Sequence, residues 1–358
     1  MSDRLRRFPL IAALGLAAVL TVSACGSATV AGSSSSSSPA TDSVSPAAAA
    51  ASGGTGGAPA GIKIGFITKT ETNPFFVKMK QGAVQAADAA GVELVTATGK
   101  FDGDNESQIT AIENMTASGV AGILLAPSDS KAIVPAVQAA RAAGIPVIVL
   151  DSPLDPQDAS DALFATDNAK AGRLIGEWAK AKFAGKPAVI ATLDYTPGVA
   201  VGTLRHDGFL AGFGIADGDP SIVCSQDSGG DQAKGQTVME NCLQGNPDIN
   251  LVYTINEPAA LGAYTAIEAA GKQDQITIVS VDGGCTGTQG VVDGKIDATS
   301  QQYPLKMAAQ GVDALVAYAG GGAKPTGYTD TGVTLITDDP QPGVASQDTG
   351  YGLQNCWG

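Results

Sequence analysis

Polar side chains stand directly after several of the apolar segments that the sequence predicts to be β-strands, and one guanidinium lies on a predicted helix. In chain order these residues are Lys69, Asn73, Asp151, Arg205, Asn256, Asp282 and Gln302. Because ligands of open parallel sheets bind beyond the carboxyl ends of the strands, we expect these side chains to share one site. Carboxylates, amides and a guanidinium pair well with hydroxyl groups, which both donate and accept hydrogen bonds. The set therefore suits a polyhydroxy compound.

Two aromatic residues, Phe75 and Phe76, open the predicted helix that follows Asn73-Pro74. Their flat apolar surface suits the C–H face of a sugar ring. Aromatic residues at the start of a helix more often belong to a hydrophobic core. Their position directly after Asn73 favours at least one ring lining the ligand site.

The sequence lacks the motifs expected of an enzyme. Any Ser-His-Asp triad would have to use its single histidine, His206, and no Gly-x-Ser-x-Gly motif accompanies it. No Cys-x-x-Cys pair supplies zinc ligands, and no Gly-x-x-x-x-Gly-Lys-Ser/Thr loop is present for phosphate. The acidic segment 102–106 fits a helix cap better than a cation site. We therefore predict no catalysis, no cofactor and no bound metal.

From residue 61 onwards the sequence alternates between short apolar segments and segments of helical length. The predicted strands are 62–67, 92–97, 120–126, 146–150, 187–192, 221–224, 250–255, 276–281 and 297–301. The predicted helices include 74–89, 105–118, 130–143, 169–183, 199–213 and 231–244. Apolar strands separated by helices indicate parallel sheets that are covered on both faces. Two such runs in succession predict an α/β fold of two doubly wound lobes.

The N-terminal part of the chain differs from the rest in composition. Residues 1–24 have a basic start, a short apolar run and small residues at the end, which is typical of an export signal. Residues 22–25, Val-Ser-Ala-Cys, look like a bacterial lipobox, in which Cys25 is lipidated; an ordinary cleavage site is the alternative. Residues 25–60 are rich in Ser, Ala and Gly and predict a flexible tether. We therefore expect an extracytoplasmic protein that a lipid anchors to the cell membrane.

The chain is acidic, with a formal net charge of -14. Removal of residues 1–24 takes away three Arg and one Asp, which moves the charge to -16. An acidic surface argues against nucleic acid as a partner and against an electrostatic hold on anionic lipid. No later segment offers the roughly 20 apolar residues that a membrane-spanning helix needs.

Four cysteines follow Cys25, and an even number in an exported chain indicates disulfides. Cys224 ends a predicted strand and Cys242 lies in the next helix, so this pair can form locally. Cys285 and Cys356 would then join the C-terminal tail to a loop. Three connectivities are possible, and free buried thiols are the alternative.

At Asn73-Pro74-Phe75-Phe76 the sequence resembles the ribose-type periplasmic sugar-binding proteins, and the resemblance extends from residue 61 to about residue 337. Further matching segments are residues 149–151, 205–209, 256–262, 281–283 and 302–304. The resemblance implies ligand-binding positions at Asn73, Phe75, Phe76, Asp151, Arg205, Asn256, Asp282 and Gln302.

Two positions depart from the ribose-binding pattern. Ser152 stands where ribose binders have an arginine, and Gly230 stands where they place an aromatic residue of the second lobe. The loss of a guanidinium and of a ring argues against ribose as the ligand. Residues 68–80 and 161–168 instead resemble the fructose-binding branch, in which Lys69 would supply a charged donor. A solvated lysine beside the cleft is the alternative.

The resemblance also implies how the chain is organised and what it does. The first lobe would be residues 61–166 and 303–329, and the second lobe residues 167–302 and 330–358. Several chain crossings between the lobes would act as a hinge. The expected protein is a monomeric receptor that closes on a monosaccharide and delivers it to an ABC permease. A receptor for a non-nutrient signal, such as a furanosyl autoinducer or a chemotaxis ligand, is the alternative.

Overall fold

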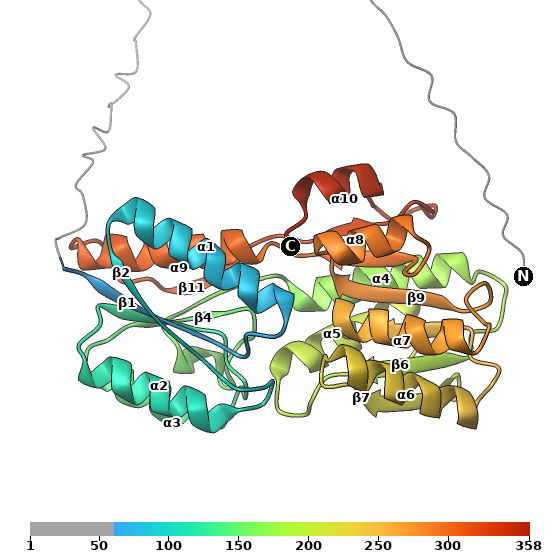
Figure 1. Ribbon diagram of the computed structural model, residues 1–358, viewed down its shortest axis with the longest axis horizontal. Coiled ribbons are helices and arrows are strands. Elements are labelled where there is room, and N and C mark those ends of the chain that lie inside the picture. Colours follow the sequence, from blue (N-terminus) through green and yellow to red (C-terminus); the bar gives the residue numbers. More distant parts are fainter. Residues whose placement is uncertain (1–60) are drawn as a thin grey trace, which may run out of the picture. The chain divides into compact units, whose positions relative to one another are not determined.

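The computed structural model describes residues 61–358, which form two α/β lobes, each built on one six-stranded sheet (Figure 1). This confirms the fold class predicted from the alternation of apolar and helical segments. The export signal, the lipidation site at Cys25 and the tether lie outside the described residues. Within residues 61–358, no helix is long and apolar enough to cross a membrane.

The first sheet has the strand order β11-β5-β4-β3-β1-β2, with every pairing parallel. Alternate residues of a strand face opposite sides, so Phe66 joins the core beneath α1 and α9, whereas Ile67 joins the core beneath α2 and α3. The strands are β1 (Lys63–Thr68), β2 (Glu93–Thr98), β3 (Gly122–Leu125), β4 (Val147–Leu150), β5 (Ala162–Ala165) and β11 (Gly327–Asp330). The helices are α1 (Pro74–Ala90), α2 (Asn105–Ala117), α3 (Val134–Ala142) and α9 (Pro304–Ala319), with a short 3₁₀ helix at Gln157–Ala159.

The second sheet has the strand order β12-β10-β9-β8-β6-β7, in which only the edge pairing of β10 with β12 is antiparallel. One core lies beneath α4 and α5, and the other beneath α6, α7 and α8. The strands are β6 (Ile190–Asp194), β7 (Ile222–Asp227), β8 (Leu251–Thr254), β9 (Thr277–Asp282), β10 (Ala298–Gln301) and β12 (Thr334–Ile336). The helices are α4 (Asn168–Lys182), α5 (Ala200–Phe213), α6 (Gln232–Gly245), α7 (Glu257–Ala269) and α8 (Cys285–Val292).

Within the described residues, three segments carry the chain between the two sheets. They connect β5 to α4, β10 to α9, and β11 to β12. The first and third segments are tied together, because the Thr331 backbone N–H donates to the Ala165 carbonyl over 3.0 Å. These two crossings therefore lie side by side.

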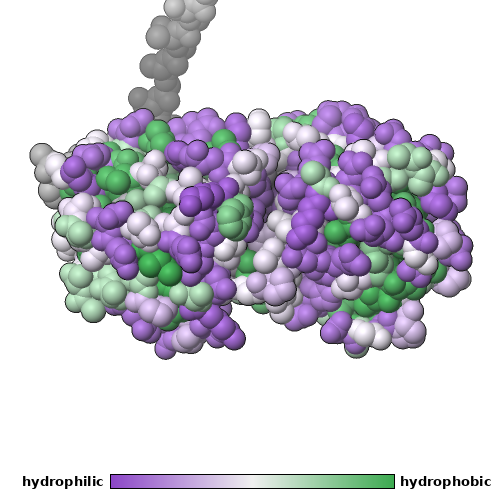
Figure 2. All heavy atoms as spheres, turned by 60° about the horizontal axis from the view of Figure 1, so that its bottom comes forward, coloured by the Kyte–Doolittle hydropathy of each residue, from purple (hydrophilic) through white to green (hydrophobic). Residues whose placement is uncertain are grey.

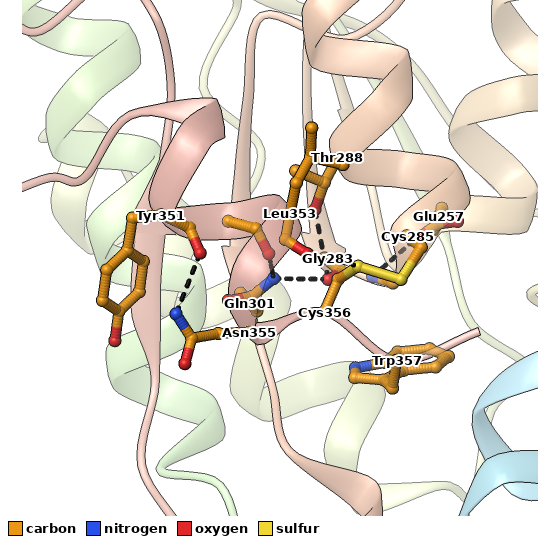
Figure 3. The surroundings of a disulfide bond; sticks show 12 residues. Glu257, Gly283, Cys285, Thr288, Gln301, Tyr351, Leu353, Asn355, Cys356 and Trp357 are labelled. Atoms are coloured by element: carbon orange, nitrogen blue, oxygen red, sulfur yellow. Dashed lines mark hydrogen bonds between the residues drawn. A yellow bond between two sulfur atoms is a disulfide. The ribbon is translucent and has the colours of Figure 1, made fainter. Parts of the chain in front are cut away.

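The C-terminal tail is fastened to the second lobe by a disulfide (Figure 3). Helix α10 (Thr349–Asn355) precedes Cys356, which is bonded to Cys285 at the start of α8. The second disulfide joins Cys224 in the edge strand β7 to Cys242 in α6. This is the local pairing among the three possible connectivities.

The sequence did not predict strands β5, β11 and β12 or helix α10. Strand β11 has the sequence Gly-Tyr-Thr-Asp and lies at a sheet edge, so it lacks the apolar run of a central strand. Strand β6 also ends at Asp194, two residues beyond the predicted end. The later end of β6 changes which residue stands directly after that strand.

Candidate ligand-binding cleft

A small cavity lies between the two lobes, where the carboxyl ends of strands from both sheets meet. The space between its walls is about 290 Å³, part of which is open to solvent. From outside, a furrow bordered mainly by hydrophilic residues marks the junction of the lobes (Figure 2). The cavity is lined by Lys69, Asn73, Phe75, Phe76, Asp151, Tyr195, Val201, Arg205, Ile255, Asn256 and Asp282.

Eight of the nine residues predicted as ligand-binding line this cavity, and Gln302 stands directly behind it. The Gln302 side-chain amide donates to the Asp282 carboxylate over 2.7 Å, so it orients that carboxylate. Its second amide atom, Oε1, is buried without a hydrogen-bond partner among the described residues. The structure thus brings the predicted set together, with Gln302 as a supporting residue.

Two buried carboxylates pair with two buried cations in the cavity wall. Lys69 Nζ lies 3.1 Å from Asp151 Oδ2. Arg205 Nη1 lies 3.5 Å from Asp282 Oδ1, and Arg205 Nη2 lies 3.9 Å from Asp151 Oδ1. Lys69 is only 1% exposed, which excludes the alternative of a solvated lysine beside the cleft.

Arg205 is held in place from the second lobe. Its Nε donates to Asn168 Oδ1 over 2.8 Å, and its Nη1 donates to the Ile255 carbonyl over 3.0 Å. The helix that carries it packs closely on α4, because a Cβ at Gly172 would stand only 2.0 Å from the Arg205 carbonyl oxygen. The guanidinium therefore reaches the cavity preoriented, with further donors free for a ligand.

The two cavity amides also begin helices. Asn73 Oδ1 accepts from the Phe75 backbone N–H, and Pro74 occupies the first turn of α1. Asn256 Oδ1 accepts from the Ala259 backbone N–H at the start of α7. Because each oxygen caps its helix, the amide groups are fixed at βα junctions, one in each lobe.

The two phenyl rings are buried and pack edge to face. The Phe75 and Phe76 centroids lie 5.3 Å apart, and Phe75 also contacts the Trp357 ring at 5.5 Å. Both rings nevertheless line the cavity. Phe75 and Phe76 therefore belong to the hydrophobic core and also form part of the cavity wall.

Burial shifts the pKa of the Asp282 carboxyl. Desolvation raises the pKa of its carboxyl to about 6, although Arg205 and Gln302 lower the pKa in part. Asp282 is therefore mainly ionised at neutral pH and can accept hydrogen bonds from hydroxyl groups.

Sequence reasoning missed Tyr195, Val201 and Ile255. Tyr195 directly follows β6, so it obeys the same strand-end rule as the residues that were found. It was overlooked because the predicted strand stopped at residue 192. Val201 and Ile255 are apolar and carry no signal that separates them from core residues.

Tyr195 also occupies the space opposite Gly230. A Cβ built at Gly230 would stand 2.5 Å from Tyr195 Cε2 and 2.8 Å from Asn256 Nδ2. Tyr195 thus places an aromatic ring of the second lobe directly beside Gly230. The other departure, Ser152, is buried and accepts a hydrogen bond from the Val201 backbone N–H over 3.2 Å.

His206 lies outside the cavity lining. Its Nδ1 is 2.6 Å from Asp194 Oδ1, and this hydrogen bond raises the pKa of the imidazole. Among residues 61–358, no group of three His, Cys, Asp or Glu side chains is arranged to hold a metal ion.

Comparison with known proteins assigns this fold to a family. The family model for the periplasmic binding protein domain matches residues 64–323. The ribose import binding protein of Bacillus subtilis is 36% identical over 241 residues, which are 67% of this chain and 76% of that protein. The D-ribose/D-allose-binding protein of Pseudomonas aeruginosa is 31% identical over 291 residues, covering 78% of this chain and 90% of that protein. The crystal structure of a galactofuranose binding protein has a TM-score of 0.73 at 28% identity, covering 82% of this chain and 97% of that chain.

The chain therefore belongs to the periplasmic binding protein family. Within it, the chain has the type I fold and falls in the sugar-binding branch of ABC importers that includes ribose, allose and galactofuranose binders. The members of this family bind solutes rather than catalyse reactions, in agreement with the prediction from the missing catalytic motifs. Such proteins work outside the cytoplasm, an environment that allows the two disulfides to persist.

Proposed function

We propose that the chain is the receptor of an ABC sugar importer and captures one monosaccharide in the cleft between its lobes. The observation that carries this proposal is the convergence of paired carboxylates, cations, amides and phenyl rings on one small cavity. Each sugar hydroxyl needs both a donor and an acceptor, and the cavity provides both from each lobe. The rings of Phe75 and Phe76 would meet the apolar face of the sugar.

Among monosaccharides, fructose is our first candidate. The buried ammonium of Lys69 supports it, because this lysine lies in the segment that resembles fructose binders. Ribose, allose and galactofuranose, for which relatives are named, are the competing ligands. Other pentoses, hexoses and polyols complete the set to be tested.

In this proposal the lobes close as two bodies, residues 61–166 with 303–329 and residues 167–302 with 330–358. The sugar stabilises the closed form only through contacts that the open form lacks. The closed monomer then docks on a permease, which reopens it. Residues 1–24 are removed as a signal peptide, and Cys25 carries the lipid that holds the receptor at the membrane. Mass spectrometry of the mature N-terminal peptide tests that last step, since lipid adds mass to Cys25.

Titration calorimetry against this panel of sugars tests the proposed function. Wild-type protein should bind at least one of them. Asp282→Ala should weaken that binding about thirtyfold or more, because it leaves Arg205 and the sugar hydroxyls without their buried partner. Asp88→Ala removes the same charge from the exposed face of α1 and serves as the matched control.

No heat with any sugar would overturn the proposed function. Binding of a furanosyl autoinducer alone would instead favour a receptor for a non-nutrient signal. An Asp282→Ala variant that binds as tightly as wild type would show that the cleft is wrongly assigned.

A further inference from the structure

Tyr195 lines the cavity from the second lobe, and its hydroxyl group bonds to the first lobe. Its hydroxyl donates to Asp102 Oδ1 over 2.8 Å, and Asp102 lies in the loop between β2 and α2 of the first lobe. Burial raises the pKa of the Tyr195 hydroxyl well above its usual value, so the group keeps its proton and remains a donor.

The Tyr195 ring also covers Lys69. Lys69 Nζ lies 5.3 Å from the centroid of Tyr195 and 5.3 Å from that of Phe76, so the ammonium is flanked by one ring from each lobe. Such contacts between a cation and a ring are strongest where water is excluded, and Lys69 is almost fully buried. The ring is thus a wall of the cavity and a cover for its first-lobe cation.

Tyr195 begins a segment, residues 195–201, that makes several further contacts with the first lobe. The Gly198 carbonyl accepts from the Ser130 backbone N–H over 3.0 Å, and the Ala200 N–H donates to Ser130 Oγ over 3.1 Å. The Val201 N–H donates to Ser152 Oγ. Because these partners belong to opposite lobes, the whole segment makes its contacts only when the lobes are together.

We propose that the ring of Tyr195 selects the sugar and that its hydroxyl holds the closed form. This inference rests on the proposed function, since it assumes that a sugar occupies the cleft. It assigns two separable tasks to one side chain. The ring limits the volume of the cavity, whereas the bond to Asp102 forms only on closure.

Substitutions at position 195 separate the two tasks. Tyr195→Phe keeps the ring and loses the hydroxyl, so the sugar should dissociate about tenfold faster with an unchanged order of preference among sugars. Tyr195→Ala should in addition change that order, because the wall is gone. Calorimetry and surface plasmon resonance with the same sugar panel measure both effects.

A double-mutant cycle tests the bond itself. Asp102→Ala should speed dissociation as much as Tyr195→Phe, and the double variant should be no faster than either alone. Additive effects would overturn the role of the hydroxyl.

Alanine substitutions at two neighbouring glycines form a matched pair, because only one of them crowds the Tyr195 ring. Gly229 and Gly230 have φ of 60° and 65°, so alanine strains the backbone similarly at both. A methyl group at Gly229 meets nothing closer than 3.5 Å, whereas at Gly230 it would collide with Tyr195 and with the Asn256 amide. Gly230→Ala should therefore weaken sugar binding clearly more than Gly229→Ala.

These experiments distinguish a failure of the proposed function from a failure of the role proposed for Tyr195. If wild type binds no sugar, the proposed function fails and this inference fails with it. If wild type binds a sugar but Tyr195→Phe and Tyr195→Ala match it in dissociation rate and in preference, the inference alone is overturned.

Discussion

Asp151 and Asp282, the two carboxylates of the cavity, have an unusual backbone conformation. Among the described residues they are the non-glycine residues with positive φ, at 65° and 123°. Such conformations cost about 1–3 kcal/mol each and persist where surrounding structure enforces them, often at functional sites. At both positions, the strain accompanies the placement of a carboxylate beyond a strand end.

Two substitutions of Asp282 measure this strain. Asp282→Gly and Asp282→Ala both remove the carboxylate, but only alanine retains the Cβ that disfavours positive φ. The glycine variant should be more stable by about 1 kcal/mol, or roughly 2 °C in melting temperature. Equal melting temperatures in calorimetric scans would show that the conformation is not strained.

Glu257 makes stability depend on pH. Burial and the nearby Asp282 raise the pKa of its carboxyl from 4.5 to about 8. Below pH 4.5 the carboxyl is protonated in both the folded and the unfolded chain, so its contribution to stability is fully present. As the pH rises, the unfolded chain releases the proton first, and this contribution is lost up to a pH of about 8.

The Glu257→Gln variant isolates this effect, because its amide stays neutral. Between pH 5 and 8 the wild type should lose stability relative to this variant, as measured by urea unfolding at each pH. Asp282 has the same sign of effect, and because its charge acts on Glu257, the difference between the two proteins also includes the coupling between these two carboxyl groups. Glu113→Gln, on the exposed face of α2, is the control and should follow the wild type. Parallel curves for wild type and Glu257→Gln would contradict this prediction.

The two disulfides should differ in their effect on the affinity for sugar. Cys285–Cys356 holds the tail, so that Trp357 packs against Phe75 at the cavity and donates to the Gln302 carbonyl over 2.8 Å. Cys224–Cys242 instead joins an edge strand to a helix within the second lobe, and neither cysteine lines the cavity.

Paired serine substitutions should reveal this difference. The bridges close loops with sequence separations of 71 and 18 residues, so their loss should cost roughly 4 and 3 kcal/mol of stability. Only the Cys285→Ser/Cys356→Ser pair should also weaken sugar binding in calorimetry. The Cys224→Ser/Cys242→Ser pair is the matched control. A similar loss of affinity in both pairs would contradict a specific role for the tail.

The sequence predicted most of the cavity because one rule of the fold places strand-end residues in it. Lys69, Asp151 and Asp282 each stand at such an end, and the apolar strands before them were recognisable. Tyr195 obeys the same rule, but β6 runs through Leu193 to the polar Asp194, two residues beyond the predicted end of the strand. Trp357 was out of reach, because its contact with Phe75 joins residues from the two ends of the described chain. No local pattern encodes such a contact.

Residues 195–201 contact the first lobe through several hydrogen bonds. Hydrogen bonds of this kind exchange readily with water, so the closed form should need the sugar to be favoured. We expect the radius of gyration in small-angle X-ray scattering to fall when the sugar is added to wild-type protein. Asp282→Ala at the same sugar concentration should show no such fall. Identical scattering of wild type with and without bound sugar would contradict hinge closure.

The position of Trp357 gives the molecule a built-in optical reporter. The sequence contains two tryptophans, and Trp178 is buried within the core of the second lobe. Trp357 instead touches Phe75 of the cavity and the backbone of a crossing segment. Binding of sugar should therefore alter the ultraviolet emission of the protein through one indole alone. Trp357→Phe should abolish the change and Trp178→Phe should preserve it, so capture can be followed in unlabelled protein by fluorescence.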